Sequence, residues 1–379
     1  MLEKIRAFVS KEAVLVVAVL AAAVSCVLVP FDEGYASYVD WRTLTLLFCL
    51  MAVVTGLRFM GVMRLLGSWA VSRASSMRAL AFALVALTFV SSMAITNDVA
   101  LITFVPLALV ALSEAGEGRY AASVVALMTV SANLGSMLLP VGNPQNLFLY
   151  RASGMDFPQF VLIMAPIVAL SAAMLVVALL IVFRGNAEGR SDCASHGILA
   201  RPAGRQKLMF VSYLLLFALS IMAVVGLIDA YPVAVLVALV LFFLDRRTLT
   251  KVDYGLLLTF VALFVFVGNM ARVPAVHEAL SALVGIAPFY AAVGSSQVIS
   301  NVPAAVLLSG FTNDWTALIV GTNLGGLGTP IASMASLISL KIATASGLVG
   351  KRHYLAVFTA CNVVFLAVLC AANAVFGWA

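Results

Sequence analysis

The stretch "SANLGSMLLPVGNPQN", Ser131 to Asn146, places glycine, proline and amide side chains in the middle of an otherwise apolar segment. Glycine and proline interrupt the hydrogen-bonded ladder of a helix, and lipid cannot satisfy the N–H and C=O groups that this frees. We therefore predict a broken helix whose ends line an enclosed or water-filled site. Half-helix N-termini favour anions, whereas carbonyl ends with amide and hydroxyl oxygens favour Na+ or a proton.

The same pattern recurs as "GTNLGGLGTPIASMAS", Gly321 to Ser336, a shift of 190 residues (321 minus 131). A polar, helix-breaking tip precedes each copy: Thr96-Asn97 before the first and Ser300-Asn301 before the second. We infer an internal duplication. The aligned positions are Asn133, Leu134, Gly135, Pro140, Asn143 and Asn146 in the first copy, and Asn323, Leu324, Gly325, Pro330, Ser333 and Ser336 in the second.

The composition predicts that lipid surrounds most of the chain. Over 379 residues the mean hydropathy is +1.13 and only 10% of the residues are charged, which lies outside the range of soluble domains. We therefore expect an all-α polytopic membrane protein. Crossing a bilayer takes about 20 apolar residues, and nine runs are candidates. These predicted spans are 13–30, 43–60, 120–150, 160–183, 208–226, 232–244, 254–270, 315–342 and 354–376.

Two further apolar runs, 79–112 and 286–310, carry their polar residues at the centre, so we interpret each as a re-entrant hairpin. Irregular backbone at that depth is tolerated only beside protein or water, and the hairpin tips therefore imply a cavity. Making either run a single span would reverse the orientation of every later loop.

The basic residues test this layout, because they concentrate on cytoplasmic loops. With the N-terminus in the cytoplasm, only three of the 22 basic residues fall outside: Arg42, Arg151 and Arg272. The C-terminus is then outside, and we expect an integral protein of the plasma (inner) membrane. Topology alone explains the net charge of +6, so no nucleic-acid partner is expected.

The duplication divides the chain into two oppositely oriented halves. The first inverted repeat is 1–190, with a hairpin at 79–112 and a broken helix at 120–150. A polar cytoplasmic linker follows at 191–206, and the second repeat is 207–379, with a hairpin at 286–310 and a broken helix at 315–342. Inverted repeats with broken helices are typical of secondary transporters.

At these motifs the chain resembles the ion transporter superfamily. Thr96-Asn97-Asp98 and Ser300-Asn301-Val302 are similar to the Ser-Asn-Thr hairpin tips of divalent anion/sodium symporters, and both glycine-rich breaks are similar to the break that ends in Thr-Pro-Pro-Asn in that family. The run "TNDVALITFVP", Thr96 to Pro106, is closer to the Asn-Asp hairpin of arsenite permeases and their citrate-permease relatives.

The resemblance covers both halves and implies an elevator-type carrier, in which hairpins and broken helices move against a scaffold of the other spans. Related carriers are often homodimers. Two departures keep the sodium and dicarboxylate sites from carrying over whole: Asp98 corresponds to Val302, and Asn143 to Asn146 contains one proline where the family has two.

Asp98 is the only acidic residue that we place within the membrane. An ionised carboxylate there costs at least about 2.5 kcal/mol unless it is paired or hydrated. Two interpretations stay open: a coupling-ion ligand or proton carrier, or a cap for the free N–H groups of the return helix at Val99 to Ile102. Since no Lys or Arg is near in sequence, Na+ or a proton is the expected neutraliser.

The candidate site combines the polar residues of the two tips and the two breaks. Neither a cofactor nor a metal other than Na+ is expected, and the sequence has no Ser-His-Asp, metal-spaced His or phosphate-loop pattern that would indicate an enzyme. The substrate-binding candidates are Asn97, Asn301, Asn133, Asn323, Thr96, Ser300, Asn143, Asn146, Ser333 and Ser336; the coupling-ion candidates are Asp98, Asn97, Gly135, Asn301 and Gly325.

These features predict a secondary active transporter of a small anion, either a carboxylate or an inorganic oxyanion, coupled to a cation or a proton. Two alternatives within transport stay open: an arsenite or antimonite efflux permease, which Asn97-Asp98 favours, and a cation-proton antiporter. From a different class, an anion channel could also use hairpins and broken helices.

Overall fold

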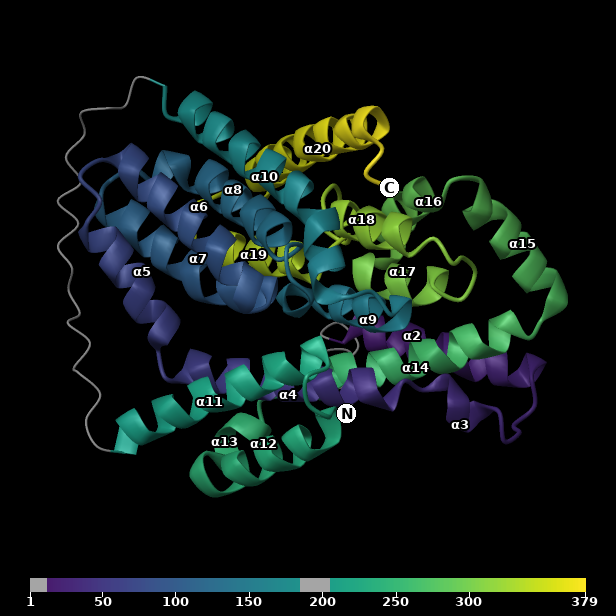
Figure 1. Cartoon of the computed structure of the whole chain (residues 1–379). Coiled ribbons are helices and arrows are strands. Elements are labelled where there is room, and N and C mark those ends of the chain that lie inside the picture. The colour runs from purple at the N-terminus through teal and green to yellow at the C-terminus, as the bar shows by residue number, and fades with distance from the viewer. Residues whose placement is uncertain (1–11, 185–204) are drawn as a thin grey trace, which may run out of the picture.

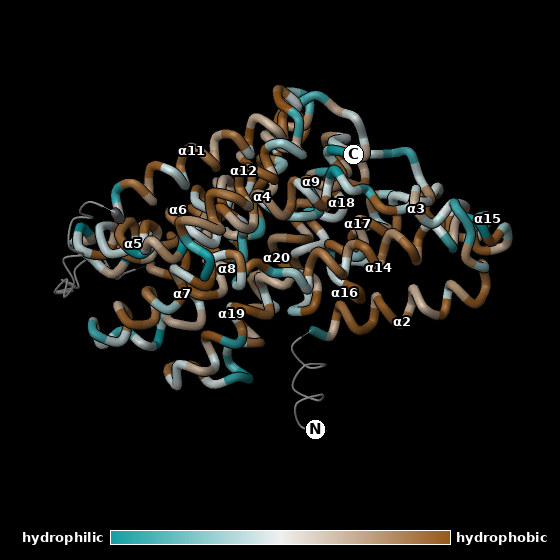
Figure 2. The backbone as a smooth tube through the Cα atoms, turned by 90° about the horizontal axis from the view of Figure 1, so that it is seen from below, coloured by the Kyte–Doolittle hydropathy of each residue, from teal (hydrophilic) through white to brown (hydrophobic). Residues whose placement is uncertain are grey.

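The computed structural model of the chain describes residues 12–184 and 205–379, and within these ranges every regular element is helical. The predicted all-α polytopic class is therefore confirmed. The predicted linker, 191–206, lies almost entirely outside the described residues. The helices form an upper and a lower layer (Figure 1), and apolar residues run along most of them, with polar residues concentrated at the connections (Figure 2).

The lower layer contains the helices that precede the two predicted hairpins. These are α2 (Ala13–Leu28), α3 (Tyr35–Tyr38), α4 (Trp41–Phe59), α11 (Arg205–Val225), α12 (Ala230–Leu244), α13 (Arg246–Leu249) and α14 (Tyr254–Ala271). Helix α2 packs along α14, and α4 packs along α11 and α12. Asp40 and Asp253 are the N-cap residues of α4 and α14. The carboxylate of each accepts a 3.0 Å hydrogen bond from a backbone N–H group of the first turn that has no partner within the helix.

The upper layer contains the two predicted hairpins, the two broken helices and the long helix after each. These are α6 (Met77–Ala94), α7 (Asn97–Glu114), η1 (Gly118–Tyr120), α8 (Ala121–Gly135), η2 (Pro140–Gly142), α9 (Pro144–Ser153), α10 (Phe157–Val182), α16 (Pro288–Ile299), α17 (Asn301–Leu308), α18 (Trp315–Gly325), α19 (Met334–Ala345) and α20 (Lys351–Phe376).

Two helices connect the layers at opposite ends of the molecule, α5 (Val62–Ser72) and α15 (Pro274–Ile286) (Figure 1). Helix α15 meets α16 at an angle of 111°. Each half of the chain therefore runs through the molecule in the same order: lower-layer helices, a connecting helix, a helix pair, a broken helix and a long helix.

Seven helical segments of the described residues are long and apolar enough to cross a membrane, or eight if the bent pair α15–α16 counts as one span. They are α4, α6, α7, α10, α11, α14 with the short α13 before it, and α20. The predicted spans at 13–30 and 232–244 are the shorter helices α2 and α12, of 16 and 15 residues. The predicted spans at 120–150 and 315–342 are interrupted, as the glycine and proline pattern predicts.

The two predicted hairpin ranges are helix pairs of unequal length. Helices α6 and α7 have 18 residues each, about 27 Å at 1.5 Å per residue, whereas α16 and α17 have 12 and 8. By length alone, each arm of the first pair could cross a bilayer. The re-entrant placement of both pairs stays a prediction.

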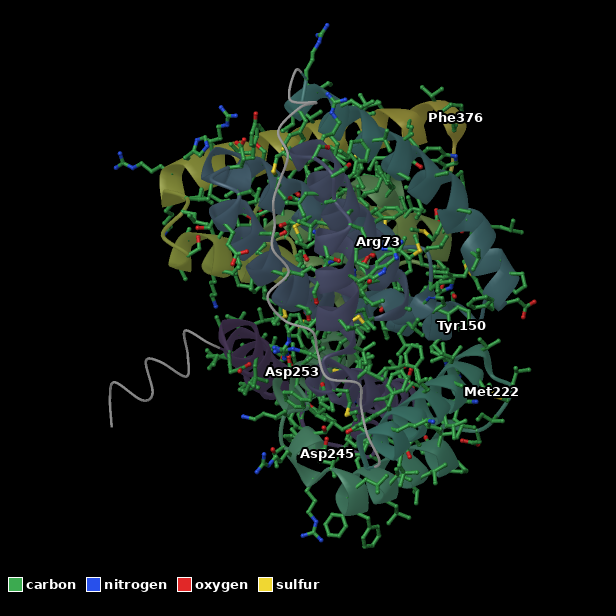
Figure 3. The ribbon with its side chains drawn as sticks, turned by 90° about the vertical axis from the view of Figure 1, so that its left-hand side faces the viewer. Arg73, Tyr150, Met222, Asp245, Asp253 and Phe376 are labelled. Atoms are coloured by element: carbon green, nitrogen blue, oxygen red, sulfur yellow. The ribbon has the colours of Figure 1, made fainter. Side chains whose placement is uncertain are left out.

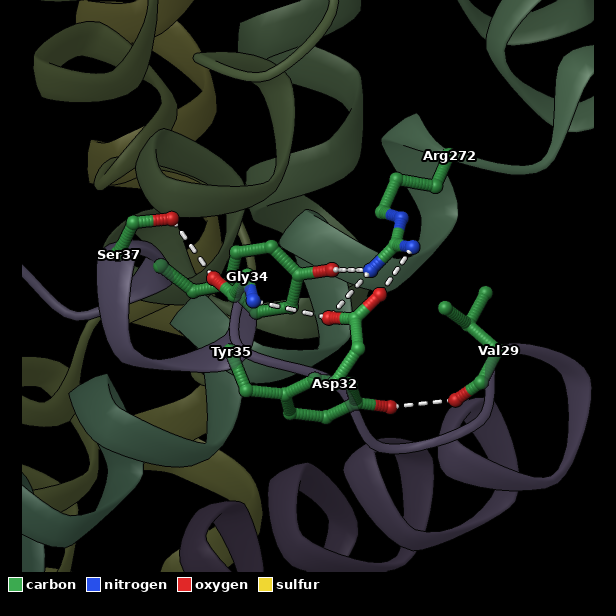
Figure 4. A network of polar contacts seen from close by, with 7 residues as sticks. Val29, Asp32, Gly34, Tyr35, Ser37 and Arg272 are labelled. Carbon is green, nitrogen blue, oxygen red and sulfur yellow. Dashed lines mark hydrogen bonds and ion pairs between the residues drawn. The ribbon is translucent and has the colours of Figure 1, made fainter.

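An ion pair joins the end of α14 to the loop that follows α2 (Figure 4). Arg272 donates through both terminal nitrogens to the carboxylate of Asp32, and one of these nitrogens also lies 2.9 Å from the hydroxyl of Tyr38. Hydrogen bonding from this guanidinium lowers the pKa of Asp32 below its ordinary value. The pair therefore fastens one end of the α2–α14 contact in the lower layer.

Candidate functional site

At the breaks, helices of one half of the chain pack against helices of the other half. The second part of each broken helix packs against the helix pair and the first part of the other: α9 contacts α17 and α18, and α19 contacts α7 and α8. This arrangement brings the two polar motifs together, although they are 190 residues apart in sequence (321 minus 131).

Asn133, at the end of α8, is the centre of one buried cluster of side chains. Its Oδ1 accepts hydrogen bonds from Asn97 Nδ2 at 3.1 Å and from Ser333 Oγ at 3.0 Å. Its Nδ2 donates to the carbonyl oxygen of Gly326 at 3.3 Å. One amide therefore connects the tip of α6–α7, the first break and the second break.

Asn323, at the end of α18, is the centre of a second buried cluster, which joins the two breaks without a residue of the α16–α17 tip. Its Oδ1 accepts from Asn143 Nδ2 at 3.2 Å, and its Nδ2 donates to Asn146 Oδ1 and to the carbonyl oxygen of Ile319. Asn133 and Asn323 are aligned positions of the duplication, and so are Ser333 and Asn143. The bonds Asn133–Ser333 and Asn323–Asn143 are therefore equivalent contacts between the halves.

Two glycines allow the close approach that these clusters need. A Cβ atom at Gly135 would lie 2.5 Å from Ser92 Oγ on α6, and one at Gly325 would lie 2.6 Å from Ser296 Oγ on α16. Asn97 and Asn301 are separated by 204 residues (301 minus 97), and so are Ser92 and Ser296. Each broken helix thus packs against its own helix pair through the same glycine and serine positions.

The carbonyl groups that each break frees are satisfied by different donors. In the first half, Asn146 Nδ2 donates to carbonyl oxygens of the 136–139 segment within its own broken helix. In the second half, Gln297 of α16 donates to the carbonyl oxygens of Gly325 at 2.8 Å and Leu327 at 2.9 Å. The residue 204 positions before Gln297 is Met93, which has no amide, so only the second break is tied to its helix pair in this way.

The two tips also differ in backbone conformation. Thr96 has φ −57° and ψ 146°, whereas Ser300 has φ 73° and ψ 153° and is the one non-glycine residue with positive φ in the described part of the chain. That region is essentially restricted to glycine. The N–H group of Asn301 donates to Ala332 in the second break at 2.9 Å and holds the tip in place.

A cavity of about 580 Å³ lies between the two layers beside the first tip. Thr96 and Asp98 line it from the upper layer, together with Pro144 and residues of α19. The lower layer contributes residues of α4 and of the turn before α14, including Asp253, which is labelled in Figure 3. A solute in this cavity would therefore contact both layers.

Asp98 is half-buried, and its Oδ1 atom is buried with no hydrogen-bond partner among the described residues. The N–H group of Asp98 donates to Asn97 Oδ1 at 2.9 Å, and the Asp98 side chain caps no helix. The structure therefore does not have the Asp98 carboxylate as a cap of the first turn of α7. Asp98 lines the cavity, and its Oδ1 atom is left to accept a hydrogen bond or to bind a cation.

The other sequence candidates are placed as follows. Ser300 is buried and lines two cavities between α2, α14, α17 and α19. The Asn301 amide nitrogen lies 2.9 Å from the position that a Cβ atom of Gly326 would occupy. Ser336 is fully buried and its Oγ has no partner among the described residues. The structure thus brings Asn97, Asn133 and Ser333 into one hydrogen-bonded group, and Asn143, Asn146 and Asn323 into another.

Sequence reasoning missed the charged residues that the lower layer contributes to the cavity. Arg58 lies in the last turn of α4, and Lys251 and Asp253 lie in the turn before α14; all three line the cavity with Glu12. Their positions near the ends of apolar runs are equally typical of ordinary cytoplasmic loop residues. Only the packing of the layers shows that they line the same cavity as Asp98.

Helices that pack in two layers around a polar cavity, inside an apolar exterior, define the class: a membrane transporter. Residues 3–312 match the citrate transporter family, so the chain belongs to this family, within the ion transporter superfamily. The resemblance seen in the motifs is thereby confirmed, and the protein is a transporter and not an enzyme.

Several relatives are similar over most of the chain. The inner membrane protein YbiR of Escherichia coli is 32% identical over 324 residues, which cover 83% of each chain. An uncharacterized transporter of Methanocaldococcus jannaschii is 30% identical over 320 residues, which cover 83% of this chain and 84% of that one. A silicon efflux transporter of Oryza sativa subsp. japonica is 33% identical over 135 residues, which cover 36% of this chain and 27% of the relative.

Proposed function

We propose that this protein is a secondary active transporter of a small anion, a carboxylate or an inorganic oxyanion, coupled to Na+ or a proton. The observation that carries the proposal is the cavity between the layers, which is lined by Asp98 of the upper layer and by Arg58 and Lys251 of the lower layer. Such a cavity offers basic groups to an anion, and the carboxylates of Asp98 and Asp253 to a coupling cation. Membership of the citrate transporter family supports the anionic substrate.

The proposed mechanism is an elevator movement of the upper layer against the lower layer. Two features support it: each half contributes to both layers in the same order, and the bonds Asn133–Ser333 and Asn323–Asn143 are equivalent contacts between the halves. We interpret the halves as inverted repeats, 1–190 and 207–379. In this scheme Asn97, Asn301, Gly135 and Gly325 hold the coupling ion with Asp98, and the remaining amides and hydroxyls of the breaks receive the substrate.

If the protein imports an anionic substrate, electrostatics requires that uptake be coupled to the entry of cations. A divalent anion entering against a membrane potential of about 100 mV is opposed by about 4.6 kcal/mol, or about 2.3 kcal/mol per charge. Cotransported cations remove this barrier. The proposal places the N-terminus in the cytoplasm and the C-terminus outside, in the plasma (inner) membrane, and it includes a homodimer.

A second candidate is efflux of an inorganic hydroxy acid such as arsenite, antimonite or silicic acid. The Asn97-Asp98 pair and the similarity to a silicon efflux transporter favour it. A ligand-induced thermal shift separates the two. Citrate or succinate, but not arsenite or silicic acid, should raise the melting temperature of the purified protein if the carboxylate proposal is correct.

The direct test is flux into proteoliposomes with Na+ and pH gradients varied separately. A carrier should take up citrate or succinate against its own gradient, and the rate should saturate. A cation-proton antiporter would instead move Na+ against protons with no organic substrate. Flux that only follows the substrate gradient and never saturates would indicate a channel and refute the proposal.

A further inference from the structure

Arg58 lies between two cavities of the molecule. It is in the last turn of α4, is half-buried, and lines both the 580 Å³ cavity at the first tip and a neighbouring cavity of about 470 Å³ between α4, α5 and α7. Ile102 of α7 also lines both. The Arg58 side chain is therefore available to a solute in either cavity.

The Arg58 side chain has no hydrogen bond or ion pair within residues 12–184 and 205–379. Some other arginines of these ranges do form such bonds: Arg78 donates to the carbonyl oxygen of Phe183, and Arg246 donates to that of Phe242. A partly desolvated charge without a partner is unfavourable, and an anion that supplied the missing hydrogen bonds would be bound more tightly for that reason.

The carboxylates of the same cavity do not supply that partner. Asp98 and Asp253 line the cavity, yet in the described part of the chain neither forms an ion pair with Arg58. Lys251 also lines the cavity, but its side chain is exposed and its ammonium group acts as a point charge. The planar guanidinium of Arg58 can instead bind a carboxylate or an oxyanion through two parallel hydrogen bonds.

We propose that Arg58 binds the anionic group of the substrate, and that this lower-layer guanidinium selects carboxylates and oxyanions over uncharged solutes. The inference rests on the proposed function, since it names the residue that recognises the anion. It differs from the sequence expectation, in which amides, hydroxyls and helix ends of the upper layer hold the anion without any basic side chain.

The test compares wild type, Arg58→Gln, Arg58→Lys and the matched control Arg246→Gln in proteoliposomes, with citrate as the anionic probe and arsenite as the uncharged one. Arg246 is exposed and lines neither cavity, so its replacement removes the same charge without changing the lining of either cavity. Arg58→Gln should raise the KM for citrate at least about tenfold. Arg58→Lys should raise it less, and Arg246→Gln should leave it unchanged.

Arsenite flux, if wild type has any, should be unaffected in every variant. Thermal unfolding of each purified variant shows whether it folds, and Arg58→Lys serves if Arg58→Gln does not fold. A folded Arg58→Gln with the wild-type KM for citrate would overturn the proposal. A wild type that moves no probe against a gradient would instead refute the proposed function, so the two failures are distinguishable.

Discussion

The equivalent hydrogen bonds Asn133–Ser333 and Asn323–Asn143 predict equal coupling energies in the two halves. Each is a neutral, buried side-chain bond, of 3.0 and 3.2 Å, and such a bond contributes about 0.5–1.5 kcal/mol to stability. Double-mutant cycles of alanine substitutions at each pair should therefore both give about 1 kcal/mol of coupling. Asn133→Ala alone should cost about 3 kcal/mol, because it removes three bonds, whereas Ser333→Ala should cost about 1 kcal/mol.

The assay is equilibrium unfolding of the purified protein in detergent micelles, followed by tryptophan fluorescence. A control cycle uses Asn133 and Asn269, which share no hydrogen-bond partner among the described residues, and should give coupling near zero. Coupling in only one half, or coupling in the control cycle as large as in the two pairs, would refute the equivalence of the two contacts.

Three further outcomes follow from single side chains. Asp98→Asn should abolish the dependence of transport on Na+ or pH while the protein still folds; unchanged transport with unchanged ion dependence would remove Asp98 from the site. Gly325→Ala should lower the free energy of unfolding by about 1–3 kcal/mol through overpacking against α16. Gly294→Ala on α16, where a Cβ meets nothing within 4 Å, should instead raise it by up to about 1 kcal/mol in the same unfolding assay. Arg272 lowers the pKa of Asp32, so the pair stabilises the fold above the ordinary value of 3.8 and loses this effect as the pH falls below it. Asp32→Asn should therefore lower the melting temperature equally from about pH 5 to about pH 8, and progressively less below pH 3.8; a difference that grew on acidification would contradict this.

The breaks in the helices could be predicted from sequence because their cause is local. Glycine and proline interrupt the hydrogen-bonded ladder of a helix whatever the surroundings. In the structure, α8 ends at Gly135 and α18 ends at Gly325. The sequence also indicated that the polar motifs of the two halves lie together, because aligned motifs of a duplication occupy equivalent places in the fold. The specific partners did not follow, because Asn133 binds Ser333 only through the exchange of α9 and α19 between the halves.

Features that depend on packing between elements could not be predicted. Arg58 and Lys251 look like ordinary loop residues until α4 and α14 are placed against α7. The lengths of α6 and α7 could not be predicted either, because apolar composition does not show where a helix ends. Each has 18 residues, which is more than a hairpin that turns halfway across the membrane would need. Gln297 has no counterpart in the first half, where Met93 stands, so the duplication gave no signal for its contacts with the second break.

The central claim, that substrate occupies the cavity between the layers, can be tested by thiol protection at Thr96. The chain has five cysteines, which are first replaced, and Thr96→Cys is then introduced at the cavity wall. Saturating citrate should slow the reaction of this thiol with a small water-soluble reagent, while a control thiol, Ser37→Cys on the exposed α3, should react at one rate with or without citrate. Equal labelling of Thr96→Cys with and without citrate, in protein that transports citrate, would contradict the account.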